Sequence, residues 1–166
     1  MEARIHHRED YLEALPERLT VTAFRSWMLA CQTSDLNCIN RMSDDFESAL
    51  GGRAGAYCGA LAGRWVKLLW RATPEPIGVY PPCCRYLSRD ECLCAAIVAA
   101  AQHGEDDIAL AASCALLRRG SESNLHGHLA LAADFASALA ECGQRLMHVP
   151  GHVVNIIAAP ETGTRH

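Results

Sequence analysis

Aromatic residues are scarce in this chain of 166 residues, at 6%, whereas alanine runs are frequent. This composition favours closely packed helices over a β-sandwich. A continuous apolar run of about 18 residues, which a membrane-spanning helix needs, is also missing. The longest candidate, residues 54–70, is interrupted by Arg64 and Lys67. We therefore expect no membrane span.

A secretory signal is not recognisable either. The first ten residues have mixed charge and no apolar segment. The nine cysteines are an odd number, and without an export signal a disulfide framework is not expected. These features predict a cytoplasmic protein with reduced thiols, in which a cysteine on an apolar helix face packs as a small hydrophobic residue.

Basic residues are not in excess, since 15 Lys and Arg stand against 19 Asp and Glu, for a formal net charge of -4. Nucleic-acid-binding proteins usually carry a basic face, so nucleic acid is not the expected partner. The sequence also lacks the G-x-S-x-G elbow, the P-loop and the G-x-G-x-x-G fingerprint. No catalytic residue is assigned, and a non-enzymatic role is favoured.

Signals that mark the starts and ends of helices are clearest between residues 88 and 143. Ser88 and Glu91 have the spacing of a capping box, in which each side chain bonds the backbone N–H of the other residue. A glycine then follows each of three apolar helical patterns and predicts where each helix ends. These glycines are Gly104, Gly120 and Gly143.

Helical periodicity also covers the N-terminal part of the chain. Pro16 is expected to separate a short helix near 8–15 from a longer helix capped by Thr20 or Thr22. Asp35 is expected to cap the next helix, which Gly51 and Gly52 stop. A third helix is predicted over 53–71.

The predicted fold is all-α, most simply one domain of about six helices in two three-helix layers. The N-terminal block covers 8–72, and the C-terminal block covers 88–143. A proline-rich connector at 73–87 crosses between them, because prolines do not continue a helix. Residues 144–166 are expected to form an extended tail, whose β-branched segment 153–157 lies on the helices or pairs with another chain.

The predicted helix at 53–71 has two unusual faces. A rotation of about 100° per residue gathers Arg53 with three other basic residues in one stripe. Glycines recur at every fourth position from Gly51, although each interior glycine costs a helix roughly 1 kcal/mol relative to alanine. Close approach of another helix, within the fold or across a dimer, would explain them. We expect an interface formed by Gly55, Gly59, Gly63, Arg64, Lys67 and Arg71.

Cysteines are concentrated at positions 83–94, which suggests zinc or an iron–sulfur cluster. The spacing is not that of a zinc knuckle, and Cys92 and Cys94 point about 200° apart on a helix. A set of Cys83, Cys84 and Cys92 is easier to bring together around one metal ion. Redox activity is the other reading, because a helix N-terminus lowers a thiol pKa.

Histidines form two short clusters, His126 with His128 and His148 with His152. A four-histidine metal site is disfavoured, because a helix of about 25 Å separates His126 from the residues that follow Gly143. His126 and His128 are interpreted as ordinary residues of a first helical turn.

The leading hypothesis is a non-enzymatic interaction or regulatory protein. It would self-associate or bind an acidic protein partner through the basic, glycine-ridged helix 53–71. The alternative is a zinc, iron–sulfur or redox-active thiol protein that uses Cys83, Cys84 and Cys92. A third hypothesis is a small-molecule sensor with a pocket between the two layers.

Overall fold

The computed structural model describes residues 11–118 and 123–160. This part of the chain is all-α and contains no strand, so the predicted fold class is confirmed. It forms a short 3₁₀ turn and seven α-helices, where about six helices were predicted. The helices are α1 Leu15–Thr33, α2 Asn37–Leu50, α3 Gly52–Ala72, α4 Arg89–His103, α5 Asp106–Leu117, α6 Ser123–Glu141 and α7 Gly151–Ala158.

The start of α1 differs from the prediction. α1 begins at Leu15, with Pro16 in its first turn, where the missing N–H of proline leaves no bond unmade. Thr20 and Thr22 therefore lie inside the helix, and the prediction that one of them caps it is wrong. In place of the short helix expected near 8–15, a 3₁₀ turn spans Tyr11–Glu13. Residues 8–10 lie outside the described range.

The other predicted helix ends agree more closely. Asp35 accepts a hydrogen bond from the N–H of Asn37 at 2.9 Å, just before α2. Both bonds of the capping box at Ser88 are present at the start of α4. Gly104 and Gly143 adopt left-handed conformations, with φ of 71° and 75°, which glycine accepts without strain. Gly120 lies outside the described residues.

A buried ion pair helps to hold the proline-rich connector, and residues 73–87 form no helix or strand. The Arg25 guanidinium of α1 bonds the carboxylate of Glu91, with an Nε to Oε1 distance of 2.6 Å. Arg25 also donates to the carbonyls of Cys84 and Tyr86 at 2.8 and 2.6 Å. The backbone carbonyl groups of the connector thus attach it to the Arg25 side chain of α1.

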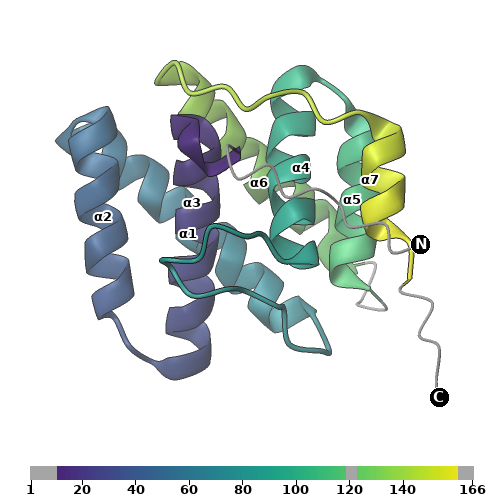
Figure 1. Cartoon of the computed structure of the whole chain (residues 1–166), viewed down its shortest axis with the longest axis horizontal. Helices are drawn as coiled ribbons and strands as arrows, with labels where there is room; N and C mark the ends of the chain where they lie inside the picture. The colour runs from purple at the N-terminus through teal and green to yellow at the C-terminus, as the bar shows by residue number, and fades with distance from the viewer. Residues whose placement is uncertain (1–10, 119–122, 161–166) are drawn as a thin grey trace.

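The predicted extended tail is wrong for residues 151–158, which form α7. Val154 and Ile157 lie three residues apart, on one side of α7, and are buried against the core. This burial outweighs the strand preference of a β-branched segment. Arg89 of α4 donates to the carbonyls of Ile157 and Ala158, which end the helix. Residues 144–150 do form an extended link (Figure 1).

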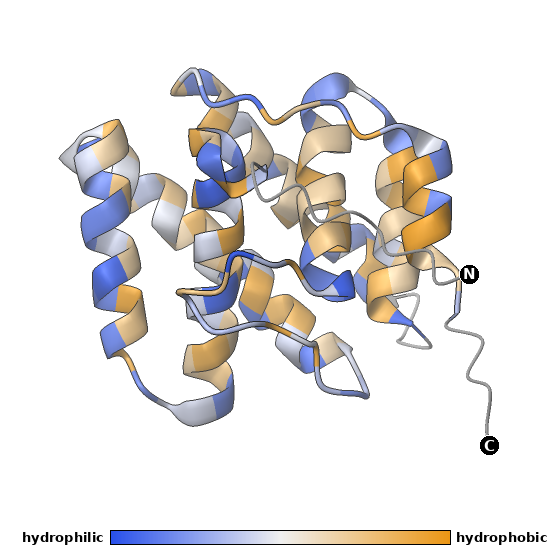
Figure 2. Cartoon of the chain, in the orientation of Figure 1, coloured by the Kyte–Doolittle hydropathy of each residue, from blue (hydrophilic) through white to orange (hydrophobic). Residues whose placement is uncertain are grey.

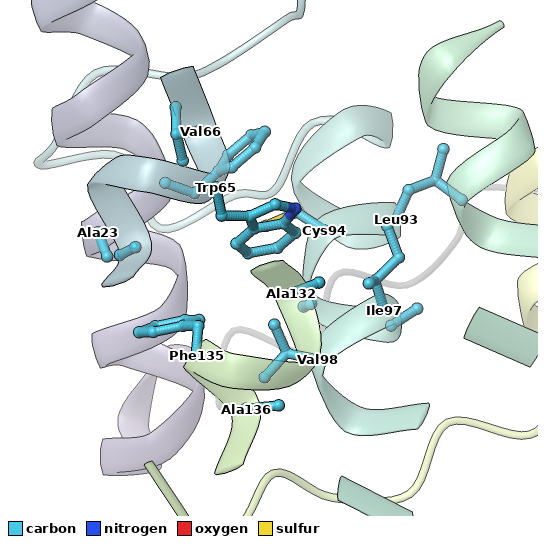
Figure 3. Close-up of a cluster of buried hydrophobic side chains, with 14 of the residues drawn as sticks. Ala23, Trp65, Val66, Leu93, Cys94, Ile97, Val98, Ala132, Phe135 and Ala136 are labelled. Carbon is cyan, nitrogen blue, oxygen red and sulfur yellow. The ribbon is translucent and has the colours of Figure 1, made fainter. Parts of the chain in front are cut away.

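The helices form two groups that meet along α6 (Figure 1). α1, α2 and α3 pack on one another, and α4, α5 and α7 form the second group. α6 contacts both α3 and α4, so the C-terminal part contributes four helices where a three-helix layer was predicted. α4 is largely hydrophobic, whereas α2 carries many hydrophilic residues (Figure 2). Trp65 lies in the centre of the core, between side chains of α4 and α6 (Figure 3).

Candidate functional site

The glycine stripe of α3 faces its neighbours within the chain. A Cβ atom on Gly55 would lie 2.6 Å from backbone atoms of Phe46 and Glu47 in α2. A Cβ on Gly63 would lie 2.5 Å from the Trp27 ring of α1. Both distances are far below an ordinary contact, so only glycine fits these two positions without movement. Of the two explanations that the sequence left open, close packing within the fold accounts for Gly55 and Gly63.

Gly59 plays a different part. The nearest atom to a Cβ at this position would be the Met42 methyl carbon at 3.7 Å, which is an ordinary contact. The Gly59 carbonyl accepts a hydrogen bond from the Trp27 ring N–H at 3.1 Å. Gly55, Gly59 and Gly63 are all buried, so they offer no exposed surface to a partner.

The basic residues of α3 lie on another, exposed side of the helix. Tyr57, which is 59% exposed, falls in the same stripe when each residue is rotated by about 100°. Tyr57 was not among the predicted site residues, although this rotation places it at the edge of the basic stripe. The exposed stripe contains no carboxylate, and we call it the basic face. It consists of Arg53, Tyr57, Ala60, Arg64, Lys67 and Arg71.

Three cations of the basic face, Arg53, Arg64 and Arg71, form no ion pair with any residue that the structure describes. Lys67 instead places its ammonium 4.6 Å from the centre of the Trp27 ring, in a cation–π contact. Burial raises the pKa of the nearby Cys31 thiol, while the positive charges of Lys67 and Arg71 act in the opposite direction.

The structure does not gather the three cysteines of the metal hypothesis. Cys83 is exposed, and Cys84 and Cys92 are half-buried. Among the residues that the structure describes, no group of three or more His, Cys, Asp or Glu is placed to hold a metal ion. Burial raises the pKa of Cys92 to about 11, so this thiol is protonated at neutral pH. The geometry therefore gives the metal and thiol hypotheses no support at this cluster.

His128 is a buried core residue and not an ordinary first-turn residue. Its Nδ1 accepts a hydrogen bond from the Trp65 ring N–H at 3.0 Å, so its proton lies on Nε2. Nε2 lies 2.9 Å from Ser113 Oγ and donates to it. Burial lowers the pKa of His128 to about 4, which keeps the ring neutral. The chain of bonds joins α3, α6 and α5 inside the core.

Two other histidines of the four-histidine set, His126 and His148, have different surroundings from His128. His126 is exposed in the first turns of α6. His148 pairs with Glu105, with 2.8 Å between Nε2 and Oε1, and its ring packs edge-on against His103. Among the described residues, these histidines belong to no group of three or more side chains placed to hold a metal ion.

A surface cavity of about 580 Å³ lies between the connector, α4, α5 and α7. Buried Asp90 accepts from the Gly78 N–H at 2.7 Å and from the guanidinium groups of Arg89 and Arg118. Arg118 also pairs with Glu75. Two guanidinium groups thus face two carboxylates, and the charges of this cavity are satisfied by one another.

Comparison with known proteins shows no matching family model, and no match was found among curated proteins or solved structures. These comparisons therefore indicate no function for the chain. No helix in the described ranges is both long enough and apolar enough to cross a membrane. The basic face of α3 is the remaining candidate site, because three of its arginines are exposed and form no ion pair within 11–118 and 123–160.

Proposed function

We propose that this chain is a non-enzymatic helical interaction protein, and that the basic face of α3 binds an acidic segment of a partner protein. The observation that carries the proposal is the exposure of Arg53, Arg64 and Arg71 without an ion pair in the described ranges. An exposed aromatic residue, Tyr57, follows Arg53 by four residues and precedes Arg64 by seven along the same helix. Unpaired arginines around an exposed tyrosine are a composition typical of protein interfaces.

The dimensions of the basic face suit a peptide segment. Arg53 and Arg71 are 18 residues apart, which corresponds to about 27 Å along an α-helix. Guanidinium groups bind carboxylates through paired hydrogen bonds, and each exposed pair contributes roughly 0.2–1 kcal/mol. The Tyr57 ring adds apolar contact area beside these charges. Several weak charge pairs around one aromatic contact would give a salt-sensitive complex.

The charge of the whole chain supports a directed encounter. The formal net charge is -4, so acidic residues outnumber basic residues outside the basic face. An acidic partner is repelled by most of the surface and attracted to one helix, which favours a single orientation.

Packing of the glycine stripe favours a partner protein over self-association through the ridge. Gly55 and Gly63 are already covered by α2 and α1. A second copy could reach these glycines only if one of those helices moved away. The glycines support the site indirectly, because they let α1 and α2 hold α3 with its charged side outward.

A charge-reversal experiment tests the proposal. Fluorescently labelled poly-L-glutamate serves as the acidic probe and is titrated with the full chain at low salt. The variant R53E/R64E/R71E is expected to bind at least about tenfold more weakly, since three attractive contacts become repulsive. Circular dichroism verifies that the variant keeps its helices.

A matched control separates the basic face from total charge. The variant R41E/R85E/R145E reverses three exposed arginines that lie outside α3 and changes the net charge equally. We expect it to bind the probe within about twofold of the wild type. Equal loss in both variants would overturn the proposal. Binding of duplex DNA through the same arginines, without binding of poly-L-glutamate, would overturn the assignment of a protein partner.

A further inference from the structure

The basic face runs straight along α3. Its six residues follow one another at intervals of four, three, four, three and four, a spacing that keeps side chains on one side of an α-helix. Arg53, Arg64 and Arg71 are separated by 11 and 7 residues, or about 16.5 and 10.5 Å along the helix axis. A rotation of 100° per residue leaves these three arginines within about 20° of one another. Their side chains therefore start from one line parallel to the axis.

The borders of the basic face allow a second helix to approach. On one side, Gly127 of α6 carries no side chain, and a Cβ on it would lie 3.5 Å from the Leu68 side chain. At this point α6 presents only backbone beside the face. On the other side, the ammonium of Lys67 lies over the Trp27 ring of α1 and is held close to the helix surface.

Ala60 leaves a gap in the row of long side chains. It is exposed, lies between Tyr57 and Arg64 in the stripe, and has only a methyl group as its side chain. When two helices pack, side chains of one helix fill the spaces between side chains of the other. Ala60 is therefore the position of the face at which a partner can insert a large apolar side chain.

We infer that the acidic segment bound by this chain is an α-helix, which lies along the basic face with carboxylates opposite its four cations and an apolar residue opposite Ala60. The four cations are Arg53, Arg64, Lys67 and Arg71. This inference rests on the proposed function, to which it adds the conformation and the register of the partner.

Backbone hydrogen bonding favours a helical partner over an extended one. An extended peptide bonds its N–H and C=O groups to the edge strand of a sheet, and the described part of this chain contains no strand. A helical partner makes its backbone bonds internally and needs only side-chain contacts. Both helices rise 1.5 Å per residue, so acidic residues at the intervals of the cations meet them one for one. An extended chain rises about 3.3 Å per residue and loses this match.

Three synthetic peptides of one composition test the partner's conformation and register. The first carries four glutamates and one leucine, and alanine and glutamine elsewhere. Its glutamates copy the intervals of the cations, which are 11, 3 and 4 residues, in antiparallel order, with leucine opposite Ala60. The second peptide has the parallel order. The third is permuted, so that its glutamates point to different sides of the helix. Each labelled peptide is titrated with the full wild-type chain at low salt.

One of the two matched peptides is expected to bind at least about tenfold more tightly than the permuted peptide, because most of its charge pairs would otherwise be lost. The far-ultraviolet circular dichroism of the mixture is expected to show a gain of helix over the sum of its parts. Equal affinity for all three peptides, or tight binding without a gain of helix, would overturn the helical partner even if poly-L-glutamate binds. If poly-L-glutamate fails to bind as well, the proposed function falls with it.

A substitution at the gap tests the register from the side of the chain. Ala60→Leu fills the gap and is expected to weaken binding of the tighter matched peptide at least about fivefold, while binding of poly-L-glutamate stays within about twofold. Ala111→Leu, at an exposed alanine of α5, is the matched control and is expected to leave both affinities unchanged. Equal binding of the matched peptide to Ala60→Leu and to the wild type would contradict the assigned register.

Discussion

Two alanine substitutions in α3 are expected to have opposite effects on stability. Gly55→Ala places a methyl group 2.6 Å from the carbonyl group of Phe46 and the N–H of Glu47, and no side-chain rotation relieves a clash with backbone atoms. α2 must shift, at a cost of about 1–3 kcal/mol for overpacking. At Gly59 the nearest atom would be the flexible Met42 methyl group at 3.7 Å, so Gly59→Ala creates no clash.

Comparison of the two variants isolates the packing contribution. Both substitutions lie in the interior of one helix and gain the same helix propensity, about 1 kcal/mol. Gly59→Ala is therefore expected to raise the free energy of unfolding by up to about 1 kcal/mol, and Gly55→Ala to fall below it by about 1–3 kcal/mol. Such a difference is large for a domain whose total stability is about 5–15 kcal/mol.

Urea unfolding at pH 7, followed by far-ultraviolet circular dichroism, measures both free energies. Gly63→Ala is a third variant to compare, because its new methyl group would clash with the Trp27 ring, a side chain that has some freedom to turn. If Gly55→Ala and Gly59→Ala agree within about 0.5 kcal/mol, Gly55 does not contact α2 and the glycine stripe is not explained by packing within the chain.

Further predictions concern the buried polar groups and the cysteines. Arg25→Met leaves the fully buried Glu91 carboxylate without its cationic partner and is expected to lower the free energy of unfolding by about 3–5 kcal/mol. The double variant R25M/E91Q is expected to lower it less, because no buried charge remains unpaired. Equal unfolding free energies for the two variants would contradict the buried ion pair. The pKa of His128 is about 4 in the folded chain, below the ordinary 6.5 of the unfolded chain. The contribution of neutral His128 to the free energy of unfolding is therefore complete above pH 6.5 and is lost as the pH falls through 4. Between pH 6.5 and pH 4, the free energy of unfolding measured in urea is expected to fall by about 3 kcal/mol more for the wild type than for His128→Gln. If the free energies of the two proteins changed in parallel with pH, the assignment would be refuted. Elemental analysis of protein purified without added metal is expected to find no stoichiometric zinc or iron, and one equivalent per chain would revive the hypothesis for Cys83, Cys84 and Cys92.

Local signals in the sequence predicted the helices that carry their own end markers. The capping box at Ser88 and the glycine at Gly104 are decided by hydrogen bonds within a few residues, so they are readable without the fold. α7 was missed because residues 153–157 prefer a strand locally, and only burial of Val154 and Ile157 against other helices makes them helical.

The candidate site was predictable in part for the same reason. The basic stripe follows from helical rotation alone, and the exposed residues of α3 agree with it. The neighbours that cover the glycines, Phe46 and Trp27, belong to other helices, so the sequence left packing within the fold and dimerisation equally open. The buried role of His128 depends on Trp65 and Ser113, which are distant in sequence and meet only in the folded core.

Backbone NMR shifts of the nitrogen-15-labelled chain during titration with poly-L-glutamate test the binding role of α3 most directly. We expect the largest salt-sensitive shifts at Arg53, Tyr57, Arg64 and Arg71, with little change in α7. No shift along α3, or the largest shifts on another helix, would show that the basic face is not the binding surface.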